Sequence, residues 1–331
     1  MIAPNRIGIL SFRENYMNRK LLTGLAFSLS LTFAVGLTAC TDDDILKYTL
    51  SDDGSYYICA AARAADPTIT QIEIPATYNG KPVAEIGHMG FLGMESVTIP
   101  DSVKVIGTDA FSGCPALKNV TIGKGVEKIE KKAFLGCTAL ESIAIPDNVT
   151  QMGSNVFEQC VNLKEVSFGA GITSIPDYTF YYCENIGHIV LPDTVETVED
   201  WAFALCGIQE ITFGSGVTTI GENAFSECTN LKSVTLPEGL TALKRWAFNG
   251  CTRLETVFYN GRNALAFDHY TLNECMGLKG VFTENTFGYW VNHDMLKFVE
   301  LVDIYFYSET EPTDDDLKYW HYVDGEIAVW E

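Results

Sequence analysis

Cysteine is the residue type in this 331-residue chain with the widest chemistry, because thiols bind metals, form disulfides and act as nucleophiles. Eight of the ten cysteines share one phase of a regular spacing: Cys114, Cys137, Cys160, Cys183, Cys206, Cys228, Cys251 and Cys275. None has the C-x₂-C neighbour of a zinc site. In repeats stacked about 4.8 Å apart, parallel side chains resist the disulfide dihedral of about 90°. We expect a ladder of buried free thiols, with disulfides or a metal as the alternatives.

The other reactive residue types form no catalytic motif. Cys59 is out of phase, and its apolar neighbours favour a packed residue over a reactive thiol. The histidines lack H-x₃-H spacing, and neither G-x-S-x-G nor H-E-x-x-H occurs. Three Gly-x-Gly turns and the aspartate run 314–316 lack the spacing of a phosphate loop and of a calcium loop. We predict no enzyme, no cofactor and no metal site; a site at the C-terminal cap that uses His321, Asp324 or Glu326 is the catalytic alternative.

The cysteines belong to a repeat that phenylalanine also marks. Phenylalanines precede seven of them by three residues, at spacings of 23, 23, 23, 23, 22 and 23: Phe111, Phe134, Phe157, Phe180, Phe203, Phe225 and Phe248. The unit reads A-F-x-x-C-x-x-L-x-x-V-x-I, as in residues 110–122. Its L-x-x-V-x-I part matches the strand signature of leucine-rich repeats. Each copy therefore predicts one short strand with inward residues such as Val120 and Ile122, and copies must stack to bury them.

A second period of about 46 residues runs through the same region. After successive strands, Pro-Asp or Pro-Glu pairs at 100–101, 146–147, 192–193 and 237–238 alternate with Gly-x-Gly at 123–125, 169–171 and 214–216. Proline ends a strand ladder, and glycine permits a turn with positive φ. We therefore expect two kinds of turn in alternation.

The frame A-F-x-x-C-x-x-L-x-x-V-x-I-P resembles that of the BspA-like leucine-rich-repeat family, over residues 70–283. Departures are local: the copy at Cys206 is one residue short, and the degenerate first copy, which begins at Phe91, has Gly93 and Met94 near the expected Cys and Leu positions. The resemblance implies a repeat solenoid, a β-rich, right-handed array of about nine rungs. It also implies a bacterial surface protein that adheres to host matrix proteins or to other bacteria.

Both ends of such an array need caps, because stacked strands leave open edges and an open core. Residues 47–69 have two strand-like segments around the turn 51–54 and predict an N-terminal β-hairpin cap. Residues 284–331 hold no repeat copy and predict a C-terminal β cap, with a strand at 302–307 and a hairpin over 319–330.

The N-terminus has the sequence of a lipoprotein signal. Residues 1–39 contain a basic start and an uncharged stretch from Leu21 to Ala39, and a lipobox-like ending places the lipid on Cys40. Met17 stands where such a signal usually starts, which indicates a misassigned start codon. An uncleaved membrane helix is the alternative, since a span needs about 20 apolar residues. Residues 40–46 are predicted to be an acidic linker that resembles a surface-export signal.

Net charge restricts the partners. Lys and Arg total 22 and Asp and Glu total 43, a formal net charge of −21. Such a surface repels phosphate backbones, which excludes nucleic acid as the main partner. It also repels anionic lipid, so membrane contact must come from the acyl chains alone. We expect a monomer, lipid-anchored and exposed on the outer membrane.

The outward strand residues are the remaining candidate site. The selected residues lie on either side of inward ones, and they are Thr121, Glu165, Ser167, His188, Glu210, Thr212, Thr235 and Phe258. A solvated Ser/Thr-rich sheet without a role is the alternative interpretation, since β-strands favour threonine. We predict that this face binds an extracellular protein or glycoprotein. A scaffold role for another envelope protein is the alternative function.

Overall fold

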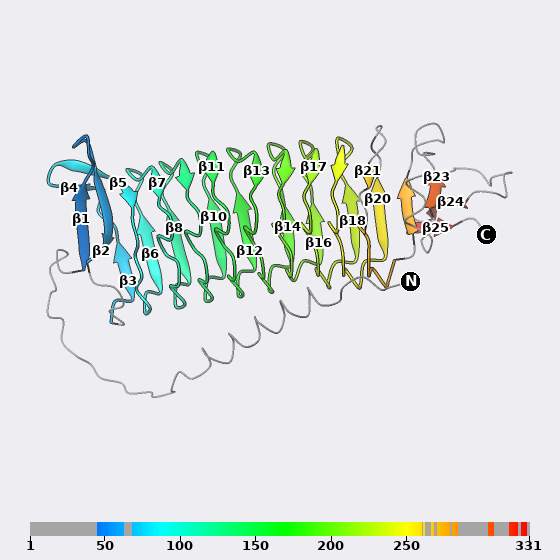
Figure 1. Cartoon of the computed structure of the whole chain (residues 1–331), viewed down its shortest axis with the longest axis horizontal. Coiled ribbons are helices and arrows are strands. Elements are labelled where there is room, and N and C mark those ends of the chain that lie inside the picture. Colours follow the sequence, from blue (N-terminus) through cyan, green and yellow to red (C-terminus); the bar gives the residue numbers. More distant parts are fainter. Residues whose placement is uncertain are drawn as a thin grey trace, which may run out of the picture. The chain divides into compact units, whose positions relative to one another are not determined.

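The computed structural model describes residues 45–62, 68–259, 261, 266–267, 270–278, 280–283, 304–307, 318–323 and 326–329. Within them every regular element is a β-strand, and the strands stack into a solenoid of mostly parallel turns (Figure 1). No helix of this described part is long and apolar enough to cross a bilayer. The predicted signal, Cys40 and the acidic run after it lie outside the described residues.

The longer strands form one side of the solenoid, which we call the strand face. They are β3 (Gln71–Glu73), β6 (Ser96–Ile99), β8 (Asn119–Ile122), β10 (Ser142–Ile145), β12 (Glu165–Phe168), β14 (His188–Val190), β16 (Glu210–Thr212), β18 (Ser233–Leu236), β20 (Thr256–Tyr259) and β22 (Gly280–Thr283). The predicted alternation is present: Ile143 and Ile145 are buried, and Ser142 and Ala144 are exposed. The strand face therefore presents every second side chain to solvent.

A second, two-residue strand in each turn forms another side, and the prediction of one strand per copy missed it. These strands are β7 (Val105–Ile106), β9 (Lys128–Ile129), β11 (Gln151–Met152), β13 (Ser174–Ile175), β15 (Thr197–Val198), β17 (Thr219–Ile220), β19 (Ala242–Leu243) and β21 (Ala266–Phe267). They pair in parallel in two sheets. Two residues are too few to show a period of two in the sequence, which is why the pattern did not predict them.

The Gly-x-Gly turns differ from their prediction. None of their glycines has a positive φ. Instead, a Cβ atom on Gly125 would overlap the carbonyl oxygen of Asp101, and one on Gly171 would overlap that of Asp147. The Asp101 carboxylate also accepts the backbone N–H of Lys124, at 2.7 Å. Glycine is therefore needed for close approach, and each Gly-x-Gly turn locks onto the Pro-Asp turn of the preceding copy.

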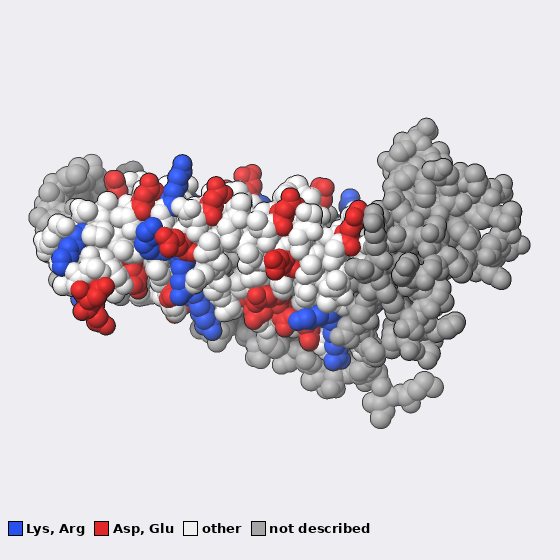
Figure 2. Space-filling model, turned by 90° about the horizontal axis from the view of Figure 1, so that it is seen from above, with Lys and Arg blue, Asp and Glu red and all other residues white. Residues whose placement is uncertain are grey.

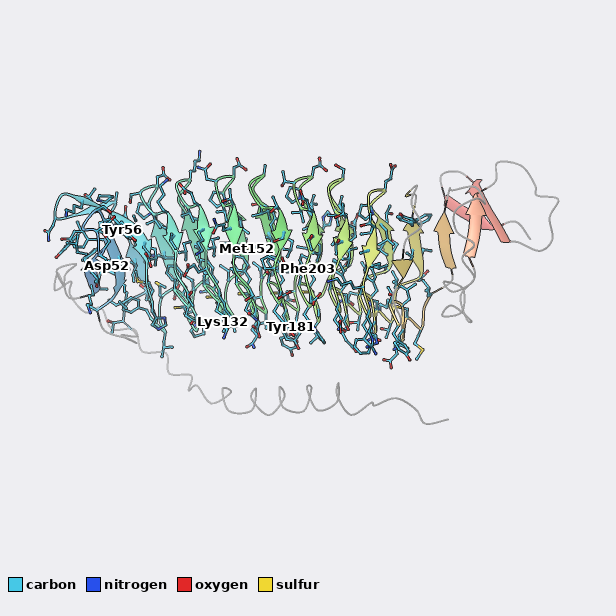
Figure 3. The ribbon with its side chains drawn as sticks, turned by 45° about the horizontal axis from the view of Figure 1, so that its top comes forward. Asp52, Tyr56, Lys132, Met152, Tyr181 and Phe203 are labelled. Carbon is cyan, nitrogen blue, oxygen red and sulfur yellow. The ribbon has the colours of Figure 1, made fainter. Side chains whose placement is uncertain are left out.

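The interior contains a column of the repeat phenylalanines. Neighbouring rings from Phe111 to Phe248 are stacked with centroids 5.1–5.4 Å apart, and all are fully buried. Phe203 illustrates the position, inside the stack (Figure 3). Each repeat thiol from Cys137 to Cys275 donates a hydrogen bond of 3.0–3.3 Å to the phenylalanine carbonyl of the preceding copy.

The nine described cysteines are free thiols, and the repeat thiols are buried except for half-buried Cys275. Of the alternatives left open by the sequence, the structure contains the thiol ladder. The hydrogen bond to the phenylalanine carbonyl is a reason for cysteine that the sequence did not indicate, because alanine at this position would leave the second lone pair of that oxygen unused.

The turns around the phenylalanines form the side that we call the turn face. The residues two before and two after each phenylalanine have a left-handed backbone, as at Lys132 (φ 61°) and Gly136 (φ 71°). Their N–H groups and that of Phe134 donate to carbonyls of the next copy at 2.8–3.0 Å. Lys132 and Tyr181 lie on this face, along the lower side of the solenoid in Figure 3. The turn face thus has its own ladder between turns, which depends on an unusual backbone.

Hairpins close both ends. β1 (Leu46–Leu50) and β2 (Tyr57–Ala61) are antiparallel, where the sequence predicts a hairpin, and β2 pairs in parallel with β5 (Lys81–Ile86). β4 (Thr77–Tyr78) pairs with β5. Beyond β22, the strands β23 (Ile304–Tyr307), β24 (Lys318–Val323) and β25 (Glu326–Val329) extend its sheet, and the last two are antiparallel. The N-terminal hairpin therefore covers an edge of a sheet of two-residue strands, and the C-terminal strands cover an edge of the strand-face sheet that contains β22.

Candidate functional site on the strand face

A row of three ionisable side chains lies in the middle of the strand face. Glu165, His188 and Glu210 occupy the same position on β12, β14 and β16, and we call them the charged row. His188 lies directly opposite Glu210 in the β14–β16 ladder, and Ile189 and Ile211 beside them are buried. All three side chains of the row are exposed. Pairing of β14 with β16 thus holds His188 beside Glu210. Glu165 has the same position on the neighbouring strand β12, so the histidine lies between two carboxylates.

A second row runs alongside and is uncharged. Ser167 and Thr212 are exposed on β12 and β16, and between them Val190 on β14 is 52% exposed. Valine is an unusual side chain at a position that holds Ser or Thr in most copies. The selection of site residues from the sequence omitted Val190, and its apolar type among Ser and Thr was the signal that could have found it.

The structure separates the other predicted residues from this centre. Thr235 is exposed on β18, the turn after β16. Thr121 on β8 and Phe258 on β20 lie two turns beyond the charged row on either side, and Phe258 is only half-exposed. The predicted face is therefore one continuous surface, and its centre consists of Glu165, Ser167, His188, Glu210 and Thr212.

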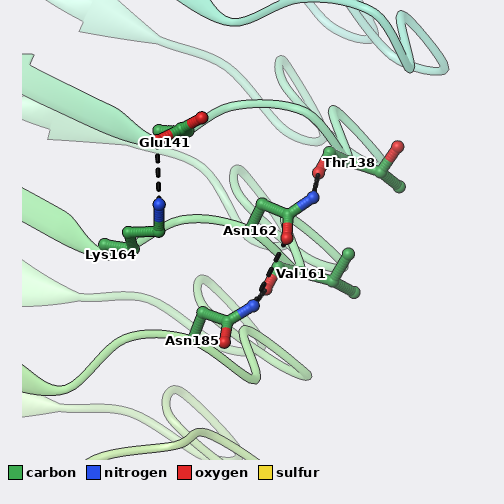
Figure 4. Close-up of polar contacts among 6 residues, drawn as sticks. All are labelled: Thr138, Glu141, Val161, Asn162, Lys164 and Asn185. Atoms are coloured by element: carbon green, nitrogen blue, oxygen red, sulfur yellow. Dashed lines mark hydrogen bonds and ion pairs between the residues drawn. The ribbon is translucent and has the colours of Figure 1, made fainter.

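Ion pairs and amide hydrogen bonds stiffen the margin of the strand face. Lys164 pairs with Glu141 at 2.9 Å, and the Asn162 and Asn185 amides each donate to a carbonyl of the preceding turn at 2.8 Å (Figure 4). Next to His188 and Glu210 the corresponding positions hold the uncharged residues 187 and 209. Around His188 and Glu210 the charges therefore come from the charged row itself.

The thiols do not form a nucleophilic site. Burial raises the pKa of the Cys59 thiol to about 12, and a hydrogen bond with Tyr48 offsets this only in part. Burial likewise raises the pKa of Cys160 to about 12. The reactive thiolate is thus suppressed at neutral pH, which argues against the reactive-thiol alternative for Cys59.

The described residues do not support the other two chemical alternatives, a catalytic site in the C-terminal cap and a metal site. His321 and Glu326 belong to the hairpin strands β24 and β25, and Asp324 lies outside the described residues. Among the residues that the structure describes, no group of three or more His, Cys, Asp or Glu is arranged to hold a metal ion. The arrangement on the strand face is suited to reversible recognition by hydrogen bonds and charge.

Comparison with known proteins agrees with the repeat architecture. A family model described as the BspA type leucine rich repeat region matches six copies, over residues 84–208 and 201–312. A leucine-rich repeat protein from Bacteroides ovatus is 26% identical, with a TM-score of 0.54 over 72% of this chain and 70% of that one. No curated protein matches the sequence.

Two further solved structures are more distant. The pneumococcal vaccine antigen PcpA is 20% identical, with a TM-score of 0.46 over 80% of this chain and 93% of its own. A leucine rich cell surface protein from Faecalibacterium prausnitzii is 22% identical, with a TM-score of 0.37 over 77% of this chain and 97% of its own.

Proposed function

Because the chain belongs to the BspA-type leucine-rich repeat family, we propose that it is a cell-surface lipoprotein that binds an extracellular protein or glycoprotein through its strand face. Leucine-rich repeat folds are scaffolds for protein interaction, and solenoids commonly bind through a long exposed surface. The observation that carries the proposal is the charged row beside exposed Val190. A solvated sheet without a role would show only the Ser/Thr background of the other turns.

The size of the surface indicates how a partner would bind. Ten strands separated by nine intervals of about 4.8 Å give a strip roughly 40 Å long, and a width of three residues gives on the order of 400 Å². A standard protein interface buries about 800 Å² on each partner. The partner therefore also contacts the turns beside the strand face, or it binds weakly and gains strength from many copies on one cell.

Charge also selects the partner. The formal net charge is −21, and acidic side chains recur along the array, with basic ones in fewer places (Figure 2). Long-range repulsion disfavours nucleic acids and sialylated or sulfated surfaces, and attraction favours a partner with a basic patch. Acylation of Cys40 supplies the membrane attachment that this charge cannot supply.

The test is a binding screen with the full chain purified in detergent and immobilised. Host matrix proteins, mucin glycans and an envelope extract of the producing organism are passed over it. We expect a saturable ligand that is lost in the triple variant Glu165→Ala, His188→Ala, Glu210→Ala. The matched control, Glu196→Ala with Glu238→Ala, removes the same two negative charges at exposed positions off the strand face and retains binding.

The outcomes separate the functions. Loss of binding in both variants would assign it to net charge and overturn the strand-face site. Capture of a partner from the envelope extract alone, with no host ligand, would replace adhesion by the scaffold role. The anchor is tested separately: Cys40→Ala is expected to abolish incorporation of labelled palmitate, and retained incorporation would contradict lipidation at Cys40.

A further inference from the structure

Two aromatic residues on the turn face have no counterpart in the early copies. Tyr178 and Trp201 occupy the same position of successive turns, two residues before the buried phenylalanine. Their rings are parallel within 3°, with centroids 5.9 Å apart, and Tyr181 meets both rings edge-on. Both side chains are half-buried, so part of each ring reaches solvent. We call Tyr178 and Trp201 the aromatic pair.

The fold does not need aromatic residues at this position. Its backbone is left-handed, with φ of 56° at Tyr178 and 60° at Trp201. The equivalent residues in the turns directly before and directly after the pair are Asn155 and Asn223, also with left-handed φ. Asparagine tolerates this conformation better than bulky aromatic residues do. The aromatic pair thus occupies a place where a smaller polar residue serves the solenoid.

Another pair farther along the chain shows what such rings accommodate. Trp246 and Tyr270 occupy the same position in later copies, with centroids 6.2 Å apart. The guanidinium of Arg245 lies over the Trp246 ring at 3.8 Å from its centroid, and at 5.7 Å from that of Tyr270. Arg245 directly precedes its ring in the chain. The chain therefore supplies its own cation, Arg245, to the rings of Trp246 and Tyr270.

In the aromatic pair, the residue before each ring is an aspartate, whereas the residue before Trp246 is Arg245. Asp177 precedes Tyr178 and Asp200 precedes Trp201. Each carboxylate is fixed by a backbone N–H of the next turn: Asp200 donates to Asp177 at 3.0 Å, and Glu222 donates to Asp200 at 2.8 Å. In the part of the chain that the structure describes, one ion pair involves these two aspartates, between Lys244 and Asp200 at 3.8 Å.

These carboxylates place the rings in a negative potential. The pKa of Tyr178 is raised by burial first, and then by Asp177, Asp200 and other nearby carboxylates. A cation above the rings would be attracted by both the ring faces and the carboxylates, without new ordering of the site. Arginine fits better than lysine, because its planar guanidinium stacks on a ring and still donates to a carboxylate in the same plane.

We propose that the aromatic pair, with Asp177 and Asp200, is a docking site for an arginine side chain of a partner protein. The bound guanidinium takes the place relative to Trp201 that Arg245 takes relative to Trp246. The site lies on the turn face and is independent of the strand-face proposal. Charge complementarity commits it to a basic protein segment.

The test uses the full chain in detergent and a fluorescent peptide, Gly-Arg-Gly-Arg-Gly, with a lysine peptide of the same length as the comparison. We expect the arginine peptide to bind more tightly. The double variant Tyr178→Asn, Trp201→Asn should weaken its binding about tenfold. This variant uses the residue already present at Asn155 and Asn223, and it changes no charge.

Controls make the result specific. Trp246→Asn should leave peptide affinity unchanged, because that ring is already covered by Arg245. Asp177→Asn with Asp200→Asn removes both negative charges but leaves a side-chain oxygen acceptor at each position and keeps the rings intact. It should weaken binding of the arginine peptide by a similar factor. The charged-row triple variant should still bind the arginine peptide, which separates this site from the strand face.

Two outcomes would overturn the proposal. Equal affinity of the wild type and the aromatic double variant would show only general attraction to an acidic protein. Ring-dependent binding of a neutral oligosaccharide, without binding of the arginine peptide, would reassign the aromatic pair to sugar recognition.

Discussion

The strand face and the turn face meet different demands from the same repeat. On the strand face the backbone is extended, and outward side chains such as Ser142, Glu165 and His188 vary without disturbing the buried residues beside them. On the turn face each copy needs two left-handed residues, a buried phenylalanine and a thiol that donates to the preceding copy. The types of the exposed side chains are therefore free to vary on the strand face and are constrained on the turn face.

This difference changes what a residue tells us. A serine or threonine on the strand face is the default for a β-strand and carries little information. An aromatic residue with left-handed φ on the turn face opposes the local preference, as Trp201 does. Departures on the turn face are therefore stronger signs of function than equal departures on the strand face.

The largest expected effect lies under the turn face. Phe157→Ala removes a fully buried ring that is stacked on Phe134 and Phe180. We expect the free energy of unfolding to fall by about 3–5 kcal/mol, measured by urea denaturation. The strand-face control Ser167→Ala should change it by less than about 0.5 kcal/mol. Equal effects would remove the distinction between the two faces.

The next effect concerns the turns that join the strand face to the two-residue strands. Gly171→Ala would place a methyl group against the carbonyls of Asp147 and Val149, and backbone has to shift. We expect a loss of about 1–3 kcal/mol in the same measurement. In the matched variant Gly239→Ala the added methyl meets only ordinary contacts, at 3.6 and 3.9 Å. A neutral Gly171→Ala would contradict close approach as the reason for these glycines.

The sequence predicted the solenoid well because every copy repeats the same buried residues. Seven phenylalanines and eight cysteines in phase leave little doubt about which side chains face inward, and all of these phenylalanines are buried. The two-residue strands escaped prediction, because no pattern exists over two residues. The predicted role of Gly125 and Gly171, a positive φ, was wrong. These glycines allow close approach between copies, which depends on how the copies stack in three dimensions.

The candidate site was predictable only in part. Alternation identified the outward residues, and stacking of successive turns then brought Glu165, His188 and Glu210 into one row. The sequence did not single out Tyr178 and Trp201, because the positions flanking each phenylalanine look like a variable turn. Their left-handed backbone and parallel rings appear only in the structure.

Alkaline pH sharpens the comparison, because thiols lie under the turn face and the strand-face side chains include none. Burial raises the pKa of the Cys160 thiol from 9.0 to about 12, so the folded state holds its proton more tightly than the unfolded state. The stabilisation is complete below pH 9 and is lost as pH rises towards about 12. Cys160→Ala should reduce the fall in unfolding free energy between pH 9 and pH 10 by about 1 kcal/mol. Ser167→Ala should leave that fall unchanged, and an unchanged slope in Cys160→Ala would contradict a protonated thiol.

The smallest effect is expected at the margin of the strand face. Lys164 and Glu141 pair at 2.9 Å, but their side chains are 58% and 59% exposed, so water and salt screen the attraction. A double-mutant cycle with Lys164→Gln and Glu141→Gln should give a coupling near the error of the urea measurement at low salt, and none in 1 M salt. A large coupling that persists in salt would show that the margin also holds the fold together. In that case only the outward side chains of the strand face would be free to vary. The residues at its margin would be constrained by the stability of the fold, as those of the turn face are.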